Sequence, residues 1–233
     1  MTEQAPAQIL VRPYSPDDRA RVREICFLTG YMGEPIDWQW RDQESFADMF
    51  TGYYTDVEPE SAFVAELDGE VSGYLLGCVD SDRAWSPGSV AGRHILRRGI
   101  AFRPGTAAMI WRTFGDALAD IVTGRTDPRK LEFADSRWPA HLHIDLLPPA
   151  RGHGIGRRLM DCWFARLRAH RITGCHLGTL AENTGAIAFF ESVGFRVHGP
   201  ALPIPGPRRR EGGRLHSQIM VTEVEALAGE DHT

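Results

Sequence analysis

The segment from Arg151 to Arg157, which contains Gly152, Gly154 and Gly156, has residue types and spacing that could bind a phosphate group. It separates an alternating apolar stretch from a stretch with helical periodicity. N–H groups at the start of a helix lack partners and attract anions, and glycine lets a phosphate approach the backbone closely. The segment therefore predicts either a diphosphate-binding turn or a strand-to-helix turn with no ligand.

Three nucleotide-binding patterns compete for this turn. The dinucleotide pattern GxGxxG fails, because its third glycine would fall at Arg157. The Walker A pattern fails, because no Gly-Lys pair followed by Ser or Thr is present. The pattern RxxGxG is met by Arg151, Gly154 and Gly156. It resembles the diphosphate loop of acyl-CoA-dependent N-acyltransferases, the GNAT superfamily.

A second stretch carries the same resemblance. From Glu182 and Asn183 to Gly194-Phe195 the sequence is similar to the second motif of the superfamily, in which an asparagine precedes a helix that ends in Gly-Phe. The resemblance covers most of the chain, from Ile9 to about Val224, without the middle insertion. A narrower resemblance, to the acetyltransferase-like C-terminal domain of animal O-GlcNAcases and to free-standing bacterial relatives, rests on four segments. They are Arg12-Pro13-Tyr14, Gly73-Tyr74-Leu75-Leu76-Gly77, Ile144-Asp145-Leu146 and the long middle insertion.

The resemblance implies acetyl-CoA as the cofactor, with CoA as the product, and it implies which residues hold it. Main-chain groups of the strand that ends at Leu146-Leu147 would contact the pantetheine and acetyl groups, and the glycine turn would bind the diphosphate. Arg151 could instead be a solvated residue at the rim, and Asn183 could be only a helix cap. The implied cofactor-binding set is Ile144, Leu146, Leu147, Arg151, Gly152, His153, Gly154, Gly156, Arg157, Asn183 and Phe190.

Phe190 stands where many members of the superfamily carry a tyrosine that protonates the departing thiolate. Phenylalanine has no proton to give. Three alternatives remain: protonation by water, another donor such as Tyr74 or Tyr31, or no catalysis. We predict direct acetyl transfer to an amine of a small molecule or peptide. The alternative is a non-catalytic acetyl-CoA-binding or interaction module.

Asp145 is the favoured catalytic residue, because it interrupts an apolar strand next to the implied acetyl site. Burying a carboxylate is costly unless it is paired or functional, and burial makes it a better base. His143 shares its strand face by alternation and could relay a proton. A paired aspartate and a core histidine are the alternatives. Weaker catalytic candidates are Glu182 and Asp80.

Other residues could contact the substrates. The aromatic residues Tyr31, Trp38 and Trp40 could wall an acceptor pocket or serve only core and loop packing. Arg208 to Arg210, in an expected flexible loop, could contact an acidic substrate or the 3′-phosphate of CoA, or be solvated charge.

Hydrophobic periodicity predicts the elements that position these residues. Strands are expected from Ile9 and over 62–67, 71–79, 140–147, 175–180 and 218–224. Helices are expected after Ser15 and over 43–54, 106–122, 157–171 and 185–193, with loops at 31–40, 86–88 and 200–213. This order predicts an α/β fold with a GNAT-like mixed, mostly antiparallel central sheet flanked by helices, and a helical insertion at about 81–138.

Composition narrows the functional class. The chain has 233 residues, of which 42% are hydrophobic and 24% charged, so a single domain over 1–233 with a core at about 9–224 is expected. A net charge of −5 argues against nucleic-acid binding, and no apolar run could span a membrane. Four dispersed cysteines and a polar start predict a cytoplasmic protein with no metal site. The insertion offers apolar helix surface that a homodimer could bury.

Overall fold

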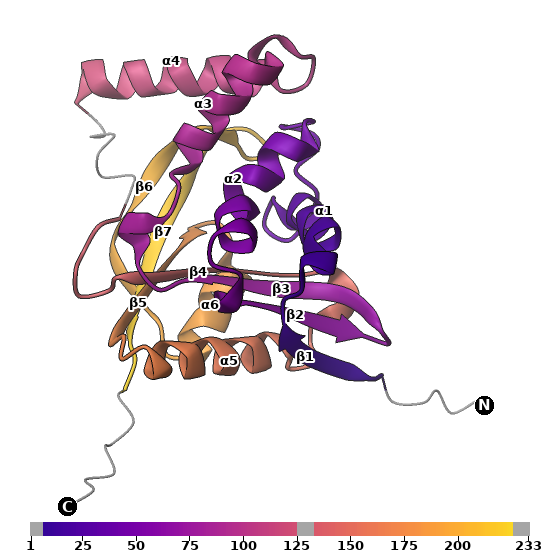
Figure 1. Ribbon diagram of the computed structural model, residues 1–233. Helices are drawn as coiled ribbons and strands as arrows, with labels where there is room; N and C mark the ends of the chain where they lie inside the picture. The colour runs from indigo at the N-terminus through magenta and orange to yellow at the C-terminus, as the bar shows by residue number, and fades with distance from the viewer. Residues whose placement is uncertain (1–6, 125–132, 226–233) are drawn as a thin grey trace, which may run out of the picture.

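The computed structural model describes residues 7–124 and 133–225, and within them one mixed sheet crosses the molecule (Figure 1). Its strand order is β1-β2-β3-β4-β5-β7-β6, and every neighbouring pair is antiparallel except β4 and β5. The predicted fold class is confirmed. The strands are β1 (Ile9–Pro13), β2 (Ala62–Leu67), β3 (Glu70–Cys78), β4 (Ala140–Leu146), β5 (Gly174–Leu180), β6 (Arg196–Arg208) and β7 (Arg214–Glu223).

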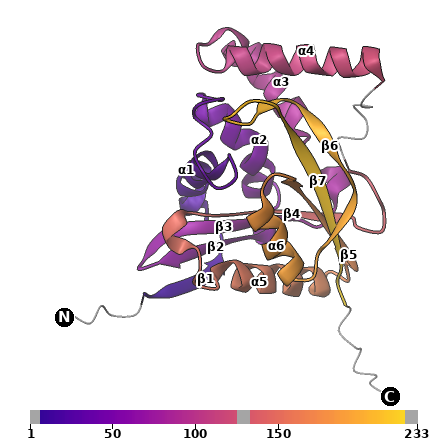
Figure 2. The same ribbon diagram turned by 180° about the vertical axis from the view of Figure 1, so that it is seen from behind.

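Helices cover both faces of the sheet, as Figures 1 and 2 show. On one face, α1 and α2 pack on β3 over buried Tyr74 and Leu76. On the other face, α5 packs on Leu75 through its buried Trp163. Alternate residues of β3 therefore belong to two separate apolar clusters. The helices are α1 (Arg19–Thr29), α2 (Gln43–Asp56), α3 (Pro87–Arg98), α4 (Ala107–Thr123), α5 (Ile155–Ala169) and α6 (Thr184–Ser192).

The two glycines inside β3 allow neighbouring side chains to come close to its backbone. A Cβ atom at Gly73 would clash with Leu146, and one at Gly77 would clash with the ring of Trp163. The pairing of β2 with β3 also shifts register beside Gly73, and the carbonyl of Ser72 there accepts a hydrogen bond of 2.9 Å from the N–H of Leu147. Both the close approach and the irregularity fit the weak strand propensity of glycine at these positions.

Strands β4 and β5 are paired only at their first residues. The parallel register joins Ala140 to Cys175 and His141 to His176, and no described pair continues it beyond His141. On the other side, β4 stays paired with β3 as far as Leu146. The last part of β4 therefore has a free edge toward β5, and this opening lies in the middle of the sheet.

The insertion between β3 and β4 holds α3 and α4, in agreement with the expected helical insertion. The expectation of a loop at 86–88 is wrong. Ser86 is the N-cap of α3, its hydroxyl accepts a hydrogen bond from the N–H of Ser89, and Pro87 is the first helical residue. Serine followed by proline is a helix-start signal. Gly88 and Gly92 concealed it, because glycine inside a segment disfavours a helix.

The expected loop over 200–213 is also wrong, because β6 extends to Arg208 and β7 begins at Arg214. Proline normally breaks a strand because it has no N–H to donate. β6 is the last strand of the sheet, and Pro203, Pro205 and Pro207 occupy every second position. Their nitrogen atoms therefore fall on one side of the strand, and an edge strand tolerates that loss.

Candidate functional site

The glycine turn presents free N–H groups at the start of α5. Gly152 and Gly154 have φ angles of 78° and 73°, and a Cβ built on either meets nothing within 4 Å. The first described backbone bond of the helix runs from the N–H of Arg158 to the carbonyl of Gly154. Among the described residues, the N–H groups of His153, Gly154, Gly156 and Arg157 donate to no protein acceptor. This arrangement suits a diphosphate.

Arg151 lies between the glycine turn and the loop that follows α1. Its Nε and one terminal nitrogen donate to the carbonyl of Leu146 at 3.0 and 2.9 Å. The same terminal nitrogen donates to the carbonyl of Gly33 at 2.6 Å. The guanidinium thus connects the end of β4 to the loop at 31–40. No local sequence pattern predicts this contact.

The hydrogen-bond alternation of β4 determines which main-chain groups face the free edge. The N–H of Leu147 donates to the carbonyl of Ser72, the residue opposite it on β3. In an antiparallel pair every second residue is bonded in this way, so the main chains of Asp145 and Tyr74 also bond to each other. The N–H and carbonyl groups of Ile144 and Leu146 then point away from β3, toward the gap left by β5. Main-chain contacts to the pantetheine were expected from Ile144 to Leu147, and only two of these four residues direct their main chain toward the gap, because Asp145 and Leu147 bond to β3.

Asp145 is half-buried on the face of β4 that α1 and α2 cover, opposite Tyr74 in the register. The hydroxyl of Tyr74 donates a hydrogen bond of 2.6 Å to Asp145 Oδ2. Burial raises the pKa of Asp145 to about 6, against the opposing effects of hydrogen bonds from Tyr74 and Thr29. The carboxylate is ionised at neutral pH and basic enough to accept a proton near pH 6.

His143 and His141 share this face of β4. Burial lowers the pKa of His143 to about 4, so the imidazole is neutral at neutral pH. Its ring makes edge contacts with Tyr54 and Phe50 of α2. Within the described part of the chain no hydrogen bond joins His143 to Asp145, so a direct relay is not assembled. His141 lies 2.6 Å from the hydroxyl of Tyr54 and 2.7 Å from that of Ser81.

Comparison with known proteins identifies the family. The model of the acetyltransferase (GNAT) family matches residues 30–195.

The chain belongs to the GNAT acetyltransferase family.

Solved structures agree with this assignment. The structure titled SsHAT is 32% identical, with a TM-score of 0.65, and the match covers 93% of this chain and 98% of that one. The protein yncA of Salmonella typhimurium, described as an acetyltransferase and solved with its cofactor acetyl-CoA, is 16% identical over 97% of this chain and 99% of its own, with a TM-score of 0.54. The polyamine N-acetyltransferase of Drosophila melanogaster, which forms N-acetylagmatine, is 16% identical over 93% of this chain and 100% of its own, with a TM-score of 0.53. The last two similarities concern the fold alone.

In this GNAT chain, the two residues expected from the second family motif have clear structural roles. The side chain of Asn183 accepts a hydrogen bond of 3.2 Å from the N–H of Ala186 and caps α6. Phe190 is 6% exposed and packs against Phe195, with ring centroids 5.8 Å apart. Its neighbour Phe189 lies so near Gly156 that a Cβ there would approach its ring to 2.9 Å. A larger residue at position 156 would therefore require the ring of Phe189 to shift, a packing effect that the motif alone does not reveal.

Arg208 is not in a flexible loop, contrary to the expectation, whereas Arg210 is exposed in the turn between β6 and β7. Arg208 ends β6 and forms an ion pair of 2.7 Å with Asp116 of α4. Arg210 lies over the rings of Tyr31 and Trp38, with centroid distances of 5.5 and 5.3 Å. The tip of the β6–β7 hairpin is thereby held against the loop at 31–40.

The remaining candidates are engaged in local contacts. Glu182 accepts a hydrogen bond of 2.8 Å from His216, and the side chain of Asp80 accepts one from the N–H of Asp82. Trp40 is buried, and its indole N–H donates to Ser45. Each of these contacts explains the presence of the residue without a role in catalysis or binding.

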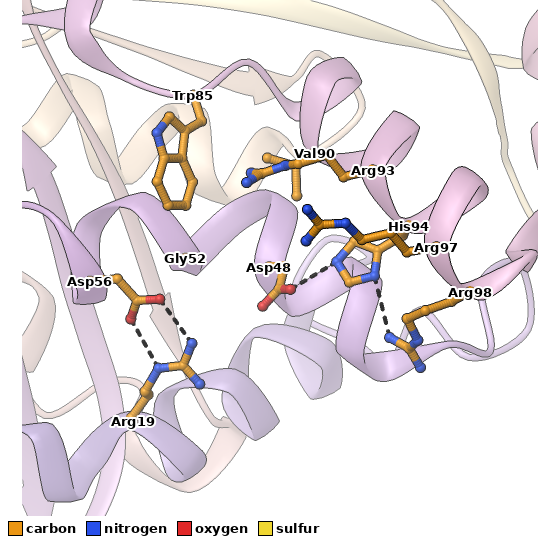
Figure 3. Close-up of a pocket in the computed structure, with 10 residues that line it drawn as sticks. All are labelled: Arg19, Asp48, Gly52, Asp56, Trp85, Val90, Arg93, His94, Arg97 and Arg98. Carbon is orange, nitrogen blue, oxygen red and sulfur yellow. Dashed lines mark hydrogen bonds and ion pairs between the residues drawn. The ribbon is translucent and has the colours of Figure 1, made fainter.

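A cavity of about 360 Å³ lies apart from these residues, where α1, α2 and α3 meet (Figure 3). Its charged side chains are partly paired: Arg19 with Asp56 at 3.0 Å, and His94 with Asp48 at 2.8 Å. None of the predicted site residues lines it. In the described ranges, no group of three or more His, Cys, Asp or Glu side chains could hold a metal ion, and no helix is long and apolar enough to cross a membrane.

Proposed function

We propose that this chain is an acetyl-CoA-dependent N-acetyltransferase that passes the acetyl group directly to an amine of a small molecule or peptide. The observation that carries the proposal is that the described residues combine two features. The N–H groups at the start of α5 have no protein acceptor, and the last part of β4 has no partner strand on its side toward β5. Together they offer donors for a diphosphate and main-chain groups for an extended amide arm.

The residues present fit this cofactor. The N–H groups of His153, Gly154, Gly156 and Arg157 would hold the diphosphate, and the space over Gly152 and Gly154 is open. The outward N–H and carbonyl groups of Ile144 and the N–H of Leu146 would pair with the pantetheine amides, since Arg151 already occupies the carbonyl of Leu146. Bound acetyl-CoA would supply an activated acetyl thioester. The oxygen of that thioester gains charge during transfer, and a main-chain N–H at the β4 edge would stabilise it.

Asp145 supplies the base in this proposal. An amine attacks only as the neutral species, so its ammonium form must first lose a proton. The carboxylate of Asp145 is ionised above pH 6 and is half-buried, so part of its residue surface is accessible. Tyr74 holds it in position and is a poor acid, because burial raises the pKa of its hydroxyl well above the ordinary value. Of the donors considered, water and Tyr31 remain to protonate the leaving thiolate.

Direct transfer is favoured over an acetyl-cysteine intermediate. Burial raises the pKa of the Cys78 and Cys175 thiols to about 12 and that of Cys26 further. The pKa of Cys162 is also raised, mainly by burial. Thiols that stay protonated are weak nucleophiles. The four reduced thiols also accord with the cytoplasmic location that the proposal includes.

The narrower relationship to the acetyltransferase-like domain of O-GlcNAcases belongs to the proposal as well. It rests on the sequence segments around Tyr14, Tyr74 and Asp145 and on the insertion between β3 and β4. It does not name an acceptor.

Release of CoA during incubation with acetyl-CoA and a panel of amines and peptides tests the proposed function. We expect a thiol signal that depends on both the acceptor and Asp145. Binding of acetyl-CoA without turnover on any acceptor would favour the non-catalytic module instead. Failure to bind acetyl-CoA would overturn both.

A further inference from the structure

Helix α4 packs on its own protein through Met109 and buried Ile110 in its first turn and through a polar side beyond them. Asp116 pairs with Arg208, and Asp120 pairs with Arg214 at 2.6 Å, so both carboxylates are directed at β6 and β7. Thr113 lies against Gly206 of β6. In Figures 1 and 2, α4 lies across the end of the β6–β7 hairpin, at the edge of the molecule. A surface helix normally has the opposite orientation, with its apolar side inward.

The opposite side of α4 is a row of large apolar side chains. Trp111, Phe114, Leu118, Ile121 and Val122 are 56%, 57%, 63%, 58% and 77% exposed. Their spacing of three, four, three and one residues keeps them on one stripe of the helix. We call this stripe, together with Phe102, the outer face of α4. Phe102 is 80% exposed, and its ring lies 6.3 Å from that of Trp111.

The stripe is shaped to pair with another helix. Trp111, Gly115, Leu118 and Val122 follow the alternating spacing of four and three residues found at helix–helix seams. Gly115 is exposed in the middle of the stripe, and a Cβ there would meet nothing within 4 Å. In an antiparallel pair, Leu118 of one helix fills the space at Gly115 of the other, and Trp111 packs on Val122. The stripe is therefore complementary to itself under two-fold symmetry.

We propose that the outer face of α4 is the interface of a homodimer, formed by two antiparallel copies of α4. Six side chains that are each more than half exposed would bury roughly 600 Å² per copy, against about 800 Å² in a standard interface. The inference is independent of the proposed acetyl transfer.

Charge argues against a lipid surface as the occupant. Helices that lie on membranes carry lysine and arginine on an exposed polar side. The polar side of α4 carries Asp116 and Asp120, which face the protein, and the chain has a net charge of −5. A second copy of the same apolar stripe needs no cationic groups.

Light scattering during gel filtration of the full-length chain tests the proposal, with L118K and W111K as variants and V57K as the matched control. Val57 is an exposed apolar residue just after α2, where a lysine suits the helix C-terminus. We expect twice the chain mass of 26.0 kDa for the wild type and V57K, and a twofold fall in mass for the two α4 variants. Circular dichroism confirms that each variant is folded.

A second variant separates shape from charge. Gly115→Ile adds apolar surface but fills the space for Leu118, so we expect weaker dimerisation, measured as an increase of about tenfold or more in the dissociation constant. A wild type that stays at 26.0 kDa up to about 100 μM would overturn the proposal. A dimer unaffected by L118K would overturn it as well, and so would a monomer that sediments with phospholipid vesicles.

Discussion

The hydroxyl of Tyr74 and the carboxylate of Asp145 are joined by a 2.6 Å hydrogen bond across β3 and β4. The two residues are directly opposite in the strand register, so the sheet itself determines the contact. Burial raises the pKa of Asp145, whereas this hydrogen bond lowers it. Tyr74 therefore limits how basic Asp145 becomes.

Tyr74→Phe is expected to move the acidic limb of the pH profile of kcat/KM above pH 6. Loss of the hydrogen bond removes an interaction that favours the ionised carboxylate, so the pKa of Asp145 rises further. The rate well above the limb should stay near that of the wild type, because the base itself remains. A uniform loss of rate at every pH would instead assign Tyr74 a purely structural role.

Asp145→Asn is expected to lower kcat/KM for the amine by about 10²–10⁴-fold, the usual effect of losing a general base. The acidic limb of the pH profile should disappear with it. The affinity for acetyl-CoA, measured by calorimetry, should be unchanged, because the variant keeps the shape of the side chain and leaves the glycine turn intact. Full activity of the variant between pH 6 and 9 would exclude Asp145 as the base.

The same substitution is expected to raise stability at high pH. The pKa of Asp145 is about 6 in the folded chain and 3.8 for an unperturbed aspartate. Between these values the folded chain binds more protons, so the free energy of unfolding falls as pH rises. Asparagine removes this dependence. The gain in Tm of the variant over the wild type should be larger at pH 8 than at pH 4, and an equal gain at both would contradict it.

Gly154→Val is expected to abolish the rise in Tm that acetyl-CoA causes, because its Cβ would enter the space above the turn. The left-handed φ of 73° also strains any residue other than glycine. Gly99→Val is the matched control, because Gly99 has a φ of 61° and open space at the end of α3. The control should lose stability but keep the shift. Equal shifts in both variants would remove the glycine turn from the proposed site.

Local patterns predicted the parts of the site that lie within single elements. The strand over 140–147 and the turn at 152–156 were both recognisable, because alternation and glycine spacing act over a few residues. The shared face of His143 and Asp145 followed from alternation alone. The pairing of Asp145 with Tyr74 did not, because it depends on which strand lies beside β4.

Contacts between distant segments could not be predicted in the same way. The hydrogen bond from Arg151 to Gly33 joins residues 118 positions apart, and Arg210 contacts Tyr31 across an even longer separation. Periodicity showed that α4 has an apolar stripe, yet it does not show whether that stripe faces inward. The ion pairs of Asp116 and Asp120 determine its orientation, and their partners lie in β6 and β7.

The free edge of β4 also bears on aggregation. An unpaired strand edge tends to recruit a strand from another chain, and proteins usually protect such edges with charged side chains, proline or a covering segment. Beyond His141 the edge lies inside the molecule, opposite β5, and Arg151 occupies the carbonyl of Leu146. The same guanidinium that connects β4 to the loop at Gly33 therefore also keeps the last acceptor on this edge from pairing with another chain.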